Sequence, residues 1–374
     1  MRQCACGRKK ENRGPKERRL MSAVGEVGFQ RRYWKCTCGG EGSYAADALL
    51  GVEGQRYSKT VQKHCCRLAA NASFASTSED LQEMLGVDLC PETVRKVVQG
   101  HAKEMARFQA KDTVSEQAFQ QAAGEVEFTT DAGKVNTREE GWKDLKIAVI
   151  SKRKAGEPTS PDQWKKQRLP AATAVLAFAM IATAKEFRKA WRPRLRRLGV
   201  TSLANLHVLA DGAGWIWKAV QRSLTGSMET LDFYHACQHL GKCAQRIFGE
   251  RASEAKTAYQ HARGLLVRQG WTGVCQWVSE LLGVAEESER ERRRPATDRL
   301  IGYFAKHSKR VNYAQRLQAG QAIGSGQVEG DAKTLGLRLK RRGARWNLAN
   351  VGPMASLVCV RHTSQWEPYW TMAA

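Results

Sequence analysis

The stretch Asn205 to Val220, NLHVLADGAGWIWKAV, places the strongest constraint on the fold of this chain. Its apolar start predicts a short buried strand that presents one carboxylate, Asp211, at its end. Gly212 and Gly214 then turn the backbone into a predicted helix. An acid at the carboxyl end of a strand is a common way to present a metal ligand in α/β folds. The alternative is that Asp211 only caps the helix.

Three more strands are predicted upstream, at residues 125–131, 142–152 and 173–181. The first of them ends on another carboxylate, Asp131. A basic helix over 185–198 then leads to the strand at 205–210. Three consecutive strands, a helix and a fourth strand is the order of an RNase H-like domain, in which the first and fourth strands are neighbours. Asp131 and Asp211 would then face each other.

Two adjacent carboxylates repel, and a divalent cation relieves the repulsion while it organises phosphate oxygens. Mg²⁺ fits because it takes one or two carboxylates together with water and phosphate. A third acid would complete a two-metal site, and the best candidate is Glu329, where the glycine-rich turn at 322–330 starts a helix. The alternative for Glu329 is a capping glutamate at a helix start.

Four motifs in this order resemble those of a bacterial insertion-sequence transposase of the Asp-Asp-Glu type, in the ISKra-like group related to the Mutator-like transposases. They are Thr130-Asp131-Ala-Gly, Leu209-Ala-Asp211-Gly-Ala, Asp232-Phe-Tyr-His235-Ala and Gly324-Ser-Gly-Gln-Val-Glu329-Gly. The resemblance covers most of the chain, from the first cysteines to Trp366. It implies that Asp131, Asp211 and Glu329 bind two Mg²⁺ ions, with Mn²⁺ as a substitute, and catalyse DNA cleavage and strand transfer.

The resemblance also places His235 beside the acids, where it would shuttle a proton or contact DNA near the scissile phosphate. The alternative is a packed histidine at the end of a strand. We count His235 among the candidate catalytic residues.

Two cysteine pairs in the same context, Cys4-Ala-Cys6-Gly and Cys36-Thr-Cys38-Gly, mark the N-terminal region. An alternating run at 24–34 between them indicates a hairpin strand. Two thiolates before the hairpin and two after it predict a tetrahedral structural Zn²⁺ site. The alternative is four unrelated thiols. The seven remaining cysteines are expected to be ordinary buried or surface thiols.

Helices are predicted at 57–71, at 78–86 with Ser78 as the cap, and from Pro91 to 98. The last two resemble a helix-turn-helix. Its recognition helix would direct four side chains to the major groove, namely Thr93, Arg95, Lys96 and Gln99. The alternative is a helical hairpin that only packs. Residues 104–121 are predicted to form a polar linker helix.

The net charge of +24 favours a polyanionic partner. DNA is the leading candidate, as terminal inverted repeats and as target, and an anionic membrane surface is the competitor. No apolar run approaches the ~20 residues of a membrane span, and the N-terminus has no signal-peptide pattern. We therefore expect a soluble intracellular protein, and the resemblance implies a bacterial cytoplasmic one, associated with the nucleoid when bound to DNA. A basic segment after Glu329 would hold phosphates over the metals: Lys340, Arg341, Arg342 and Arg345. Packing is the favoured role for the neighbouring Trp346.

The predicted fold class is α/β. A zinc ribbon-like module (1–50) and a helix-turn-helix region with its linker (51–121) precede an RNase H-like catalytic domain (122–243 and 319–374) interrupted by an all-α insertion (244–318). A homodimer or higher oligomer on DNA is expected, because two element ends must be joined. The alternatives to a transposase are a DNA-binding regulator and a structure-specific nuclease, both derived from one.

Overall fold

The computed structural model describes residues 3–341 and 343–372, apart from the side chains of 327–329 and 331–333. The chain divides into two compact units. Unit 1 contains Met1–Asp112, Asn136–Glu140 and Thr334–Ala374, and unit 2 contains Thr113–Val135 and Gly141–Lys333. No helix in the described part of the chain combines the length and the apolar character needed to cross a membrane.

Unit 1 begins with an antiparallel sheet of strands β1 (Glu11–Ser22), β2 (Gly25–Lys35) and β3 (Ser43–Tyr44), followed by helix α1 (Ala45–Leu49). The predicted hairpin strand at 24–34 is confirmed as β2. Its partner β1 was not predicted, because β1 is polar and largely exposed on both faces and so lacks the alternating apolar signal. The buried carboxylate of Asp47 in α1 joins the two strands through ion pairs with Arg18 and Arg31.

The helical part of unit 1 contains α2 (Lys59–Ala69), α3 (Phe74–Leu85), α4 (Pro91–Lys111), α15 (Leu348–Arg361) and α16 (Trp366–Met372). Two predicted features are confirmed, the helix within 57–71 and the start of a helix at Pro91. The predicted start at Ser78 is wrong. The side chain of Ser73 caps α3 by accepting from the Ser76 N–H at 3.0 Å, whereas the Ser78 hydroxyl donates to the Leu89 carbonyl across the turn.

Helix α4 is longer than predicted and runs without a break through Gly100. Its buried stripe continues from Val94 and Val98 to Met105 and Phe108, so residues 104–121 do not form a separate polar helix. A glycine inside a helix costs about 1 kcal/mol, and burial of this stripe offsets that cost. Helix α15 packs along α4. Residues 334–374, which the sequence analysis placed in the catalytic domain, thus pack with the N-terminal helices.

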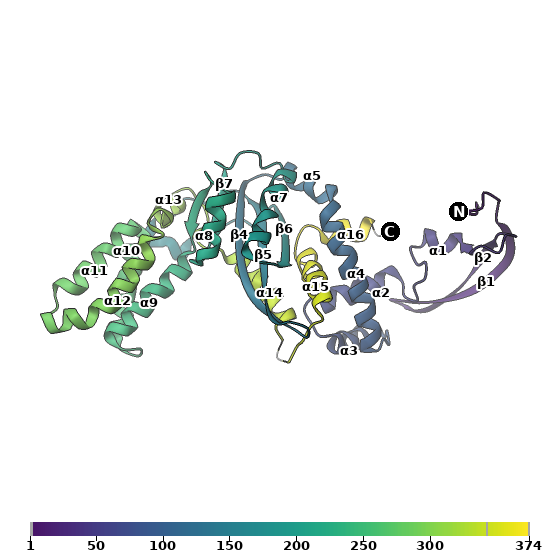
Figure 1. Ribbon diagram of the computed structural model, residues 1–374, viewed down its shortest axis with the longest axis horizontal. Helices are drawn as coiled ribbons and strands as arrows, with labels where there is room; N and C mark the ends of the chain where they lie inside the picture. Colours follow the sequence, from purple (N-terminus) through teal and green to yellow (C-terminus); the bar gives the residue numbers. More distant parts are fainter. Residues whose placement is uncertain (1–2, 342, 373–374) are drawn as a thin grey trace. The chain divides into compact units, whose positions relative to one another are not determined.

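Unit 2 is built on a five-stranded mixed sheet (Figure 1), in which β4 (Glu125–Thr137) lies between β5 (Gly141–Arg153) and β7 (Leu206–Ala210). Strand β6 (Ala174–Ile181) forms one edge beside β5, and β8 (Met228–Leu231) forms the other beside β7. Strand β5 pairs antiparallel with β6, while β4, β7 and β8 are parallel. The prediction that the strands at 125–131 and 205–210 are neighbours is confirmed.

Short helices pack against this sheet: α5 (Thr113–Gln121), α6 (Ala184–Lys189), α7 (Trp191–Arg197) and α8 (Gly214–Ser223). The short helix η1 (Pro161–Lys166) packs instead on α10 (Ser253–Gln269) and α13 (Tyr313–Gln318). The Trp191 ring lies 4.9 Å from the Phe128 ring of β4. The single helix predicted at 185–198 is wrong, because it divides at Ala190. Pro193 cannot donate to the carbonyl four residues earlier and its ring clashes with that turn, which separates α6 from α7.

The rest of unit 2 is helical, as predicted for 244–313 (Figure 1). Its helices are α9 (Phe233–Phe248), α10 (Ser253–Gln269), α11 (Trp271–Gly283), α12 (Glu287–Ala305), η2 (Ser308–Arg310), α13 (Tyr313–Gln318) and α14 (Gly326–Leu339). The charged run at 286–294, expected as a solvated loop or helix end, is the first half of α12. Arg293 is buried there and pairs with Glu289 at 2.8 Å.

Candidate functional site

Four cysteines form a compact cluster in unit 1. The sulfur atoms of Cys4, Cys6, Cys36 and Cys38 all lie within 4.8 Å of one another, with 3.5 Å between Cys4 and Cys38 and 3.6 Å between Cys6 and Cys36. One pair precedes β1 and the other follows β2. Because Glu11 pairs with Lys35, both pairs lie at the open end of the hairpin. Four thiolates in this arrangement could bind a structural metal such as zinc.

Each cysteine pair lies on the same kind of turn. The Gly7 N–H donates to the Cys4 carbonyl at 2.9 Å, and the Gly39 N–H donates to the Cys36 carbonyl at 3.3 Å. Both glycines have positive φ, 82° and 80°, which side chains rarely tolerate. Hydrogen bonds from the Cys38 backbone and side chain lower the pKa of the Cys36 thiol to about 7. A lowered pKa favours the thiolate form that binds a metal.

Two carboxylates lie where the pairing of two neighbouring parallel strands ends in unit 2. Asp211 follows the last residue of β7, whereas β4 continues to Thr137, so the prediction that the first strand ends at Asp131 is wrong. Thr130 of β4 pairs with Ala210 of β7, and the next residue on each strand is an acid, Asp131 and Asp211 respectively. Adjacent strands lie about 4.8 Å apart, so the backbone register alone brings the two acids together. Both side chains are partly buried.

The alternative role of Asp211 as the cap of α8 is wrong in detail. The N-cap position of α8 is Ala213. The Asp211 side chain accepts from the Ala213 N–H at 2.9 Å, which fixes the turn before the helix. The Asp211 carbonyl also accepts from the Trp217 indole N–H at 2.7 Å. The turn therefore holds the carboxylate at the strand end, ahead of the helix.

The Asp232 carboxylate joins the end of β8 to the turn before α14. One oxygen accepts from the His235 N–H at 2.7 Å and caps α9. The other accepts from the Ser325 N–H at 2.5 Å and from the Ser325 hydroxyl at 2.8 Å. Asp232 is 4% exposed, so these bonds are shielded from water. Asp232, which the sequence analysis named only as part of a motif, thus fixes the turn that leads into the helix of Glu329.

The backbone of Glu329 lies in α14, and its side chain is outside the described residues. The predicted glycine-rich turn and the helix that follows it are confirmed. Gly324 is required in this turn, because a Cβ there would lie 2.8 Å from the Tyr234 ring and 3.3 Å from the Asp232 carboxylate.

Histidines from α9 and from the segment after α12 gather around Tyr303 of α12, which lies beside the turn of Asp211. The His235 ring lies 5.3 Å from the His239 ring on α9, and His239 stacks on Tyr303 of α12 at 3.6 Å. His307 lies 5.0 Å from the Tyr303 ring. The sequence analysis named only His235. The i, i+4 spacing of His235 with His239 was the available signal, because such residues share one helix face. Tyr303 and His307 gave no such signal, since α12 ends at Ala305.

The Tyr303 ring covers the turn after β7, since a Cβ on Gly212 would lie 2.2 Å from its hydroxyl oxygen. That hydroxyl is buried without a hydrogen-bond partner among the described residues. Burial, and then the charges of Asp211 and Asp232, raise the pKa of Tyr303. Burial and neighbouring cations lower the pKa of His239 and His307 to about 4. The surroundings of Asp211 therefore hold neutral, proton-bearing groups at neutral pH.

The predicted DNA-contacting residues divide between two hollows of unit 1. Arg95 and Gln99, one turn apart on α4, line one cavity together with Arg341 and Arg345. Thr93 and Lys96 lie on another face of α4 and line a different hollow. Lys340 is exposed, and Arg342 lies outside the described residues. The favoured packing role of Trp346 is confirmed: the residue is buried, and its indole N–H donates to the Leu339 carbonyl at 3.0 Å.

A model of an uncharacterised protein family (UPF0236) matches residues 8–152 of the chain. The matched segment begins after the first cysteine pair and runs through β1–β3 and α1–α5 to strand β5, and it includes Asp131 but not Asp211. It covers less than half of the chain. No curated protein matches the sequence.

Proposed function

We propose that this protein is a Mg²⁺-dependent DNA transposase of the Asp-Asp-Glu type, which cleaves the ends of an insertion sequence and transfers the freed strand into target DNA. The observation that carries the proposal is the register of the sheet. Asp131 and Asp211 follow directly on the paired residues Thr130 and Ala210 of parallel strands. The sheet order β6-β5-β4-β7-β8 is also the order expected of an RNase H-like domain.

The donor groups fit the metal that this chemistry requires. Carboxylate oxygens are hard ligands, and Mg²⁺ takes one or two of them and completes its shell with water and phosphate. Asp131 and Asp211 would hold it, and Glu329 on α14 is the proposed third ligand. Bound Mg²⁺ would activate water and stabilise charge on the leaving oxygen.

The residues around the acids would keep this edge of the sheet in one geometry. The Ala213 N–H orients Asp211, and the bonds from Asp232 to Ser325 fix the turn that leads to Glu329. His235 is partly buried on the first turn of α9 and is our candidate for moving a proton near the scissile phosphate. The proposed function of the cysteine cluster is structural zinc binding, which would close the two ends of the N-terminal hairpin.

The experiment is incubation of the full-length protein with Mg²⁺ and DNA that carries the terminal repeats of the element, followed by separation of cleaved and joined products. We expect the wild-type protein to cleave and join DNA and the Asp211→Asn variant to do neither. Cleavage that persists in the Asp211→Asn variant would show that the acids are misassigned. Cleavage without joining would identify a nuclease.

A DNA-binding regulator remains the second candidate, and the arginine-lined cavity of unit 1 favours it, since that cavity needs no metal. Tight binding of the terminal repeats with no cleavage in Mg²⁺ or Mn²⁺ would establish the regulator instead of the transposase.

A further inference from the structure

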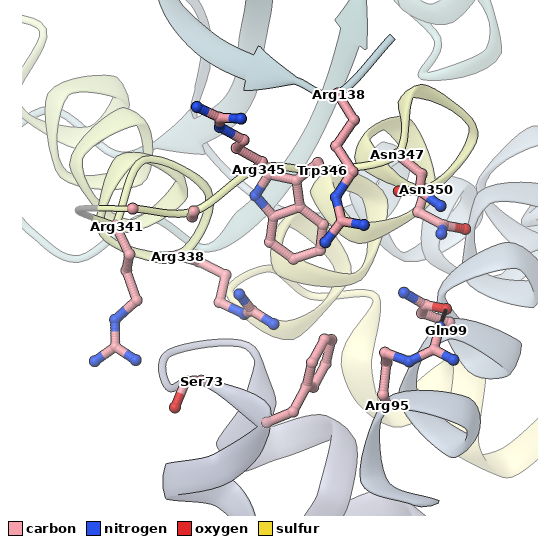
Figure 2. Close-up of a pocket in the computed structure, with 13 residues that line it drawn as sticks. Ser73, Arg95, Gln99, Arg138, Arg338, Arg341, Arg345, Trp346, Asn347 and Asn350 are labelled. Carbon is pink, nitrogen blue, oxygen red and sulfur yellow. Dashed lines mark hydrogen bonds between the residues drawn. The ribbon is translucent and has the colours of Figure 1, made fainter. Parts of the chain in front are cut away.

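A cavity of about 890 Å³ in unit 1 gathers positive charge from separate parts of the chain (Figure 2). Its volume lies in the range of ~300–1,000 Å³ typical of ligand sites. Five arginines line it, and no aspartate or glutamate does so among the described residues. The lining residues are Ser73, Phe74, Arg95, Gln99, Arg138, Arg338, Arg341, Gly343, Ala344, Arg345, Trp346, Asn347 and Asn350.

Arg338 is the most buried of the five, with 3% of its surface exposed. Its guanidinium carbon lies 4.8 Å from the ring centres of both Phe74 and Trp346. The Nε atom donates to the Ala69 carbonyl, whereas Nη2 is buried without a partner among the described residues. A buried cation with an unused donor is costly. An anionic ligand in the cavity would compensate it.

The Arg95 guanidinium is oriented by hydrogen bonds to its neighbours on α4. Its Nε atom donates to Glu92 at 2.7 Å, and its Nη1 atom donates to the Gln99 side chain at 2.8 Å. In Figure 2, Arg138 and Arg95 enter the cavity from opposite sides. Because Glu92 does not line the cavity, its charge orients Arg95 without occupying the space for a ligand.

The start of α15 adds a partial positive charge to the same cavity. Asn347 is the N-cap and makes no side-chain capping bond, and Asn350 lies in the first turn of this 14-residue helix. The Leu348 N–H donates to the Glu139 carboxylate at 2.8 Å, so an anion already occupies one of the backbone donors at the start of this helix. Helix N-termini favour anions, and phosphate groups in particular.

We propose that this cavity binds an unpaired stretch of a DNA strand. The guanidinium groups would hold its phosphates, as in grooves that track single strands. The side-chain amides of Gln99, Asn347 and Asn350 would meet base edges, which only an unpaired base presents in full. A concave cavity of this size admits one strand and its bases, whereas the paired bases of a duplex stay inside the helix. This site goes beyond the proposed cleavage, because it lies in unit 1 and requires no metal.

The first test measures binding of a short labelled single strand, and of the duplex of the same sequence, to the full-length protein in EDTA over a series of salt concentrations. The Arg341→Gln/Arg345→Gln variant should bind the single strand about tenfold more weakly. The slope of log K against log salt should fall by about 1.4, since each phosphate contact on a single strand contributes roughly 0.7.

The matched control is Lys103→Gln/Arg107→Gln, which removes two exposed charges of α4 outside the cavity. It should change single-strand binding by less than about twofold. Equal losses in the two variants, or an equal loss of duplex and single-strand binding, would overturn the proposal.

A second variant, Asn347→Asp, separates binding from folding. Asn347 makes no side-chain capping bond, so the exchange removes no hydrogen bond from α15 and the melting temperature should change little. The new carboxylate would repel phosphates at the cavity, and single-strand affinity should fall about threefold or more. Unchanged affinity would contradict the proposal. Both tests run without Mg²⁺, so a failure of the proposed cleavage would not affect them.

Discussion

The two units of this protein concentrate opposite kinds of chemistry and assemble them by different means. Unit 2 presents two carboxylates where the pairing of β4 with β7 ends, and one hydrogen-bonded register brings Asp131 and Asp211 together. Unit 1 presents four thiols and an arginine-lined cavity. The cavity depends on side chains from segments far apart in sequence. The pairing of β4 with β7 that brings Asp131 and Asp211 together can be inferred from the order of the strands in the sequence, whereas the cavity cannot.

The largest expected effect is confined to unit 1. Removal of zinc by a chelator, or Cys36→Ser, should release the hairpin at 1–50, because structural Zn²⁺ contributes on the order of 10 kcal/mol to such modules. Metal analysis of the wild-type protein should find one zinc per chain. Limited proteolysis should cut within the hairpin only in the zinc-free protein or in the variant. Cys275→Ser, outside the cluster, is the control. A metal-free protein with a protease-resistant hairpin would contradict this prediction.

The next prediction compares the activities proposed for the two units in one variant. Asp211→Asn should lower proposed Mg²⁺-dependent cleavage by about 10³-fold, since a metal ion contributes several kcal/mol to stabilising the transition state. Single-strand binding in EDTA should be unchanged. Asp298→Asn, an exposed acid of α12, is the control for charge. If Asp211→Asn also abolished single-strand binding, the two activities would not belong to separate units.

Asp232→Asn tests the connection between β8 and the turn before α14. The Asp232 carboxylate now accepts hydrogen bonds from two backbone N–H groups, and an asparagine amide nitrogen would face one of them with a second donor. The free energy of unfolding should therefore fall by about 1–3 kcal/mol. Ser325→Ala removes only the hydroxyl bond and should cost less. Urea unfolding measures both. A larger loss for Ser325→Ala than for Asp232→Asn would show that the carboxylate does not hold this turn.

Gly212→Ala tests the close approach of Tyr303 to the acid edge. A Cβ at Gly212 would lie 2.2 Å from the Tyr303 hydroxyl, and moving the ring should cost about 1–3 kcal/mol. Gly214→Ala, two residues on, meets nothing within 4 Å and should change stability by less than about 0.5 kcal/mol. Equal thermal unfolding of the two variants would contradict the packing of Tyr303 on this turn.

The last expected effect is a pH dependence that belongs to unit 2. Burial lowers the pKa of His207, His239 and His307 to about 4, against about 6.5 when unfolded. The unfolded state therefore binds more protons between these values, and stability should fall as pH drops from about 6.5 to about 4. The Arg316 guanidinium donates to His207 at 2.9 Å and reinforces its neutral form. Urea unfolding of wild type and His207→Gln measures the slope, which should be shallower in the variant. Identical slopes would show that His207 does not contribute.

Much of the candidate site could be predicted because it follows local backbone rules. The cysteine pairs share one turn with a glycine of positive φ, and the acids follow apolar runs that read as strands. Strand β8 and the polar strand β1 were missed, since neither carries a clear alternating signal. The split of the basic helix at Ala190 required weighing Pro193 against the helical pattern.

The sequence by itself determined the grouping of the cysteine pairs, the neighbouring strands and the position of Asp211 at the end of its strand, but not the continuation of β4 beyond Asp131. These features depend on spacing and strand order, which are properties of the chain. Only the tertiary structure decided that Asp232 bonds to Ser325, that Tyr303 covers Gly212, and that Arg95 shares a cavity with Arg341. The reason is physical: side chains far apart in sequence meet through packing of whole elements, and no local periodicity encodes which of them meet.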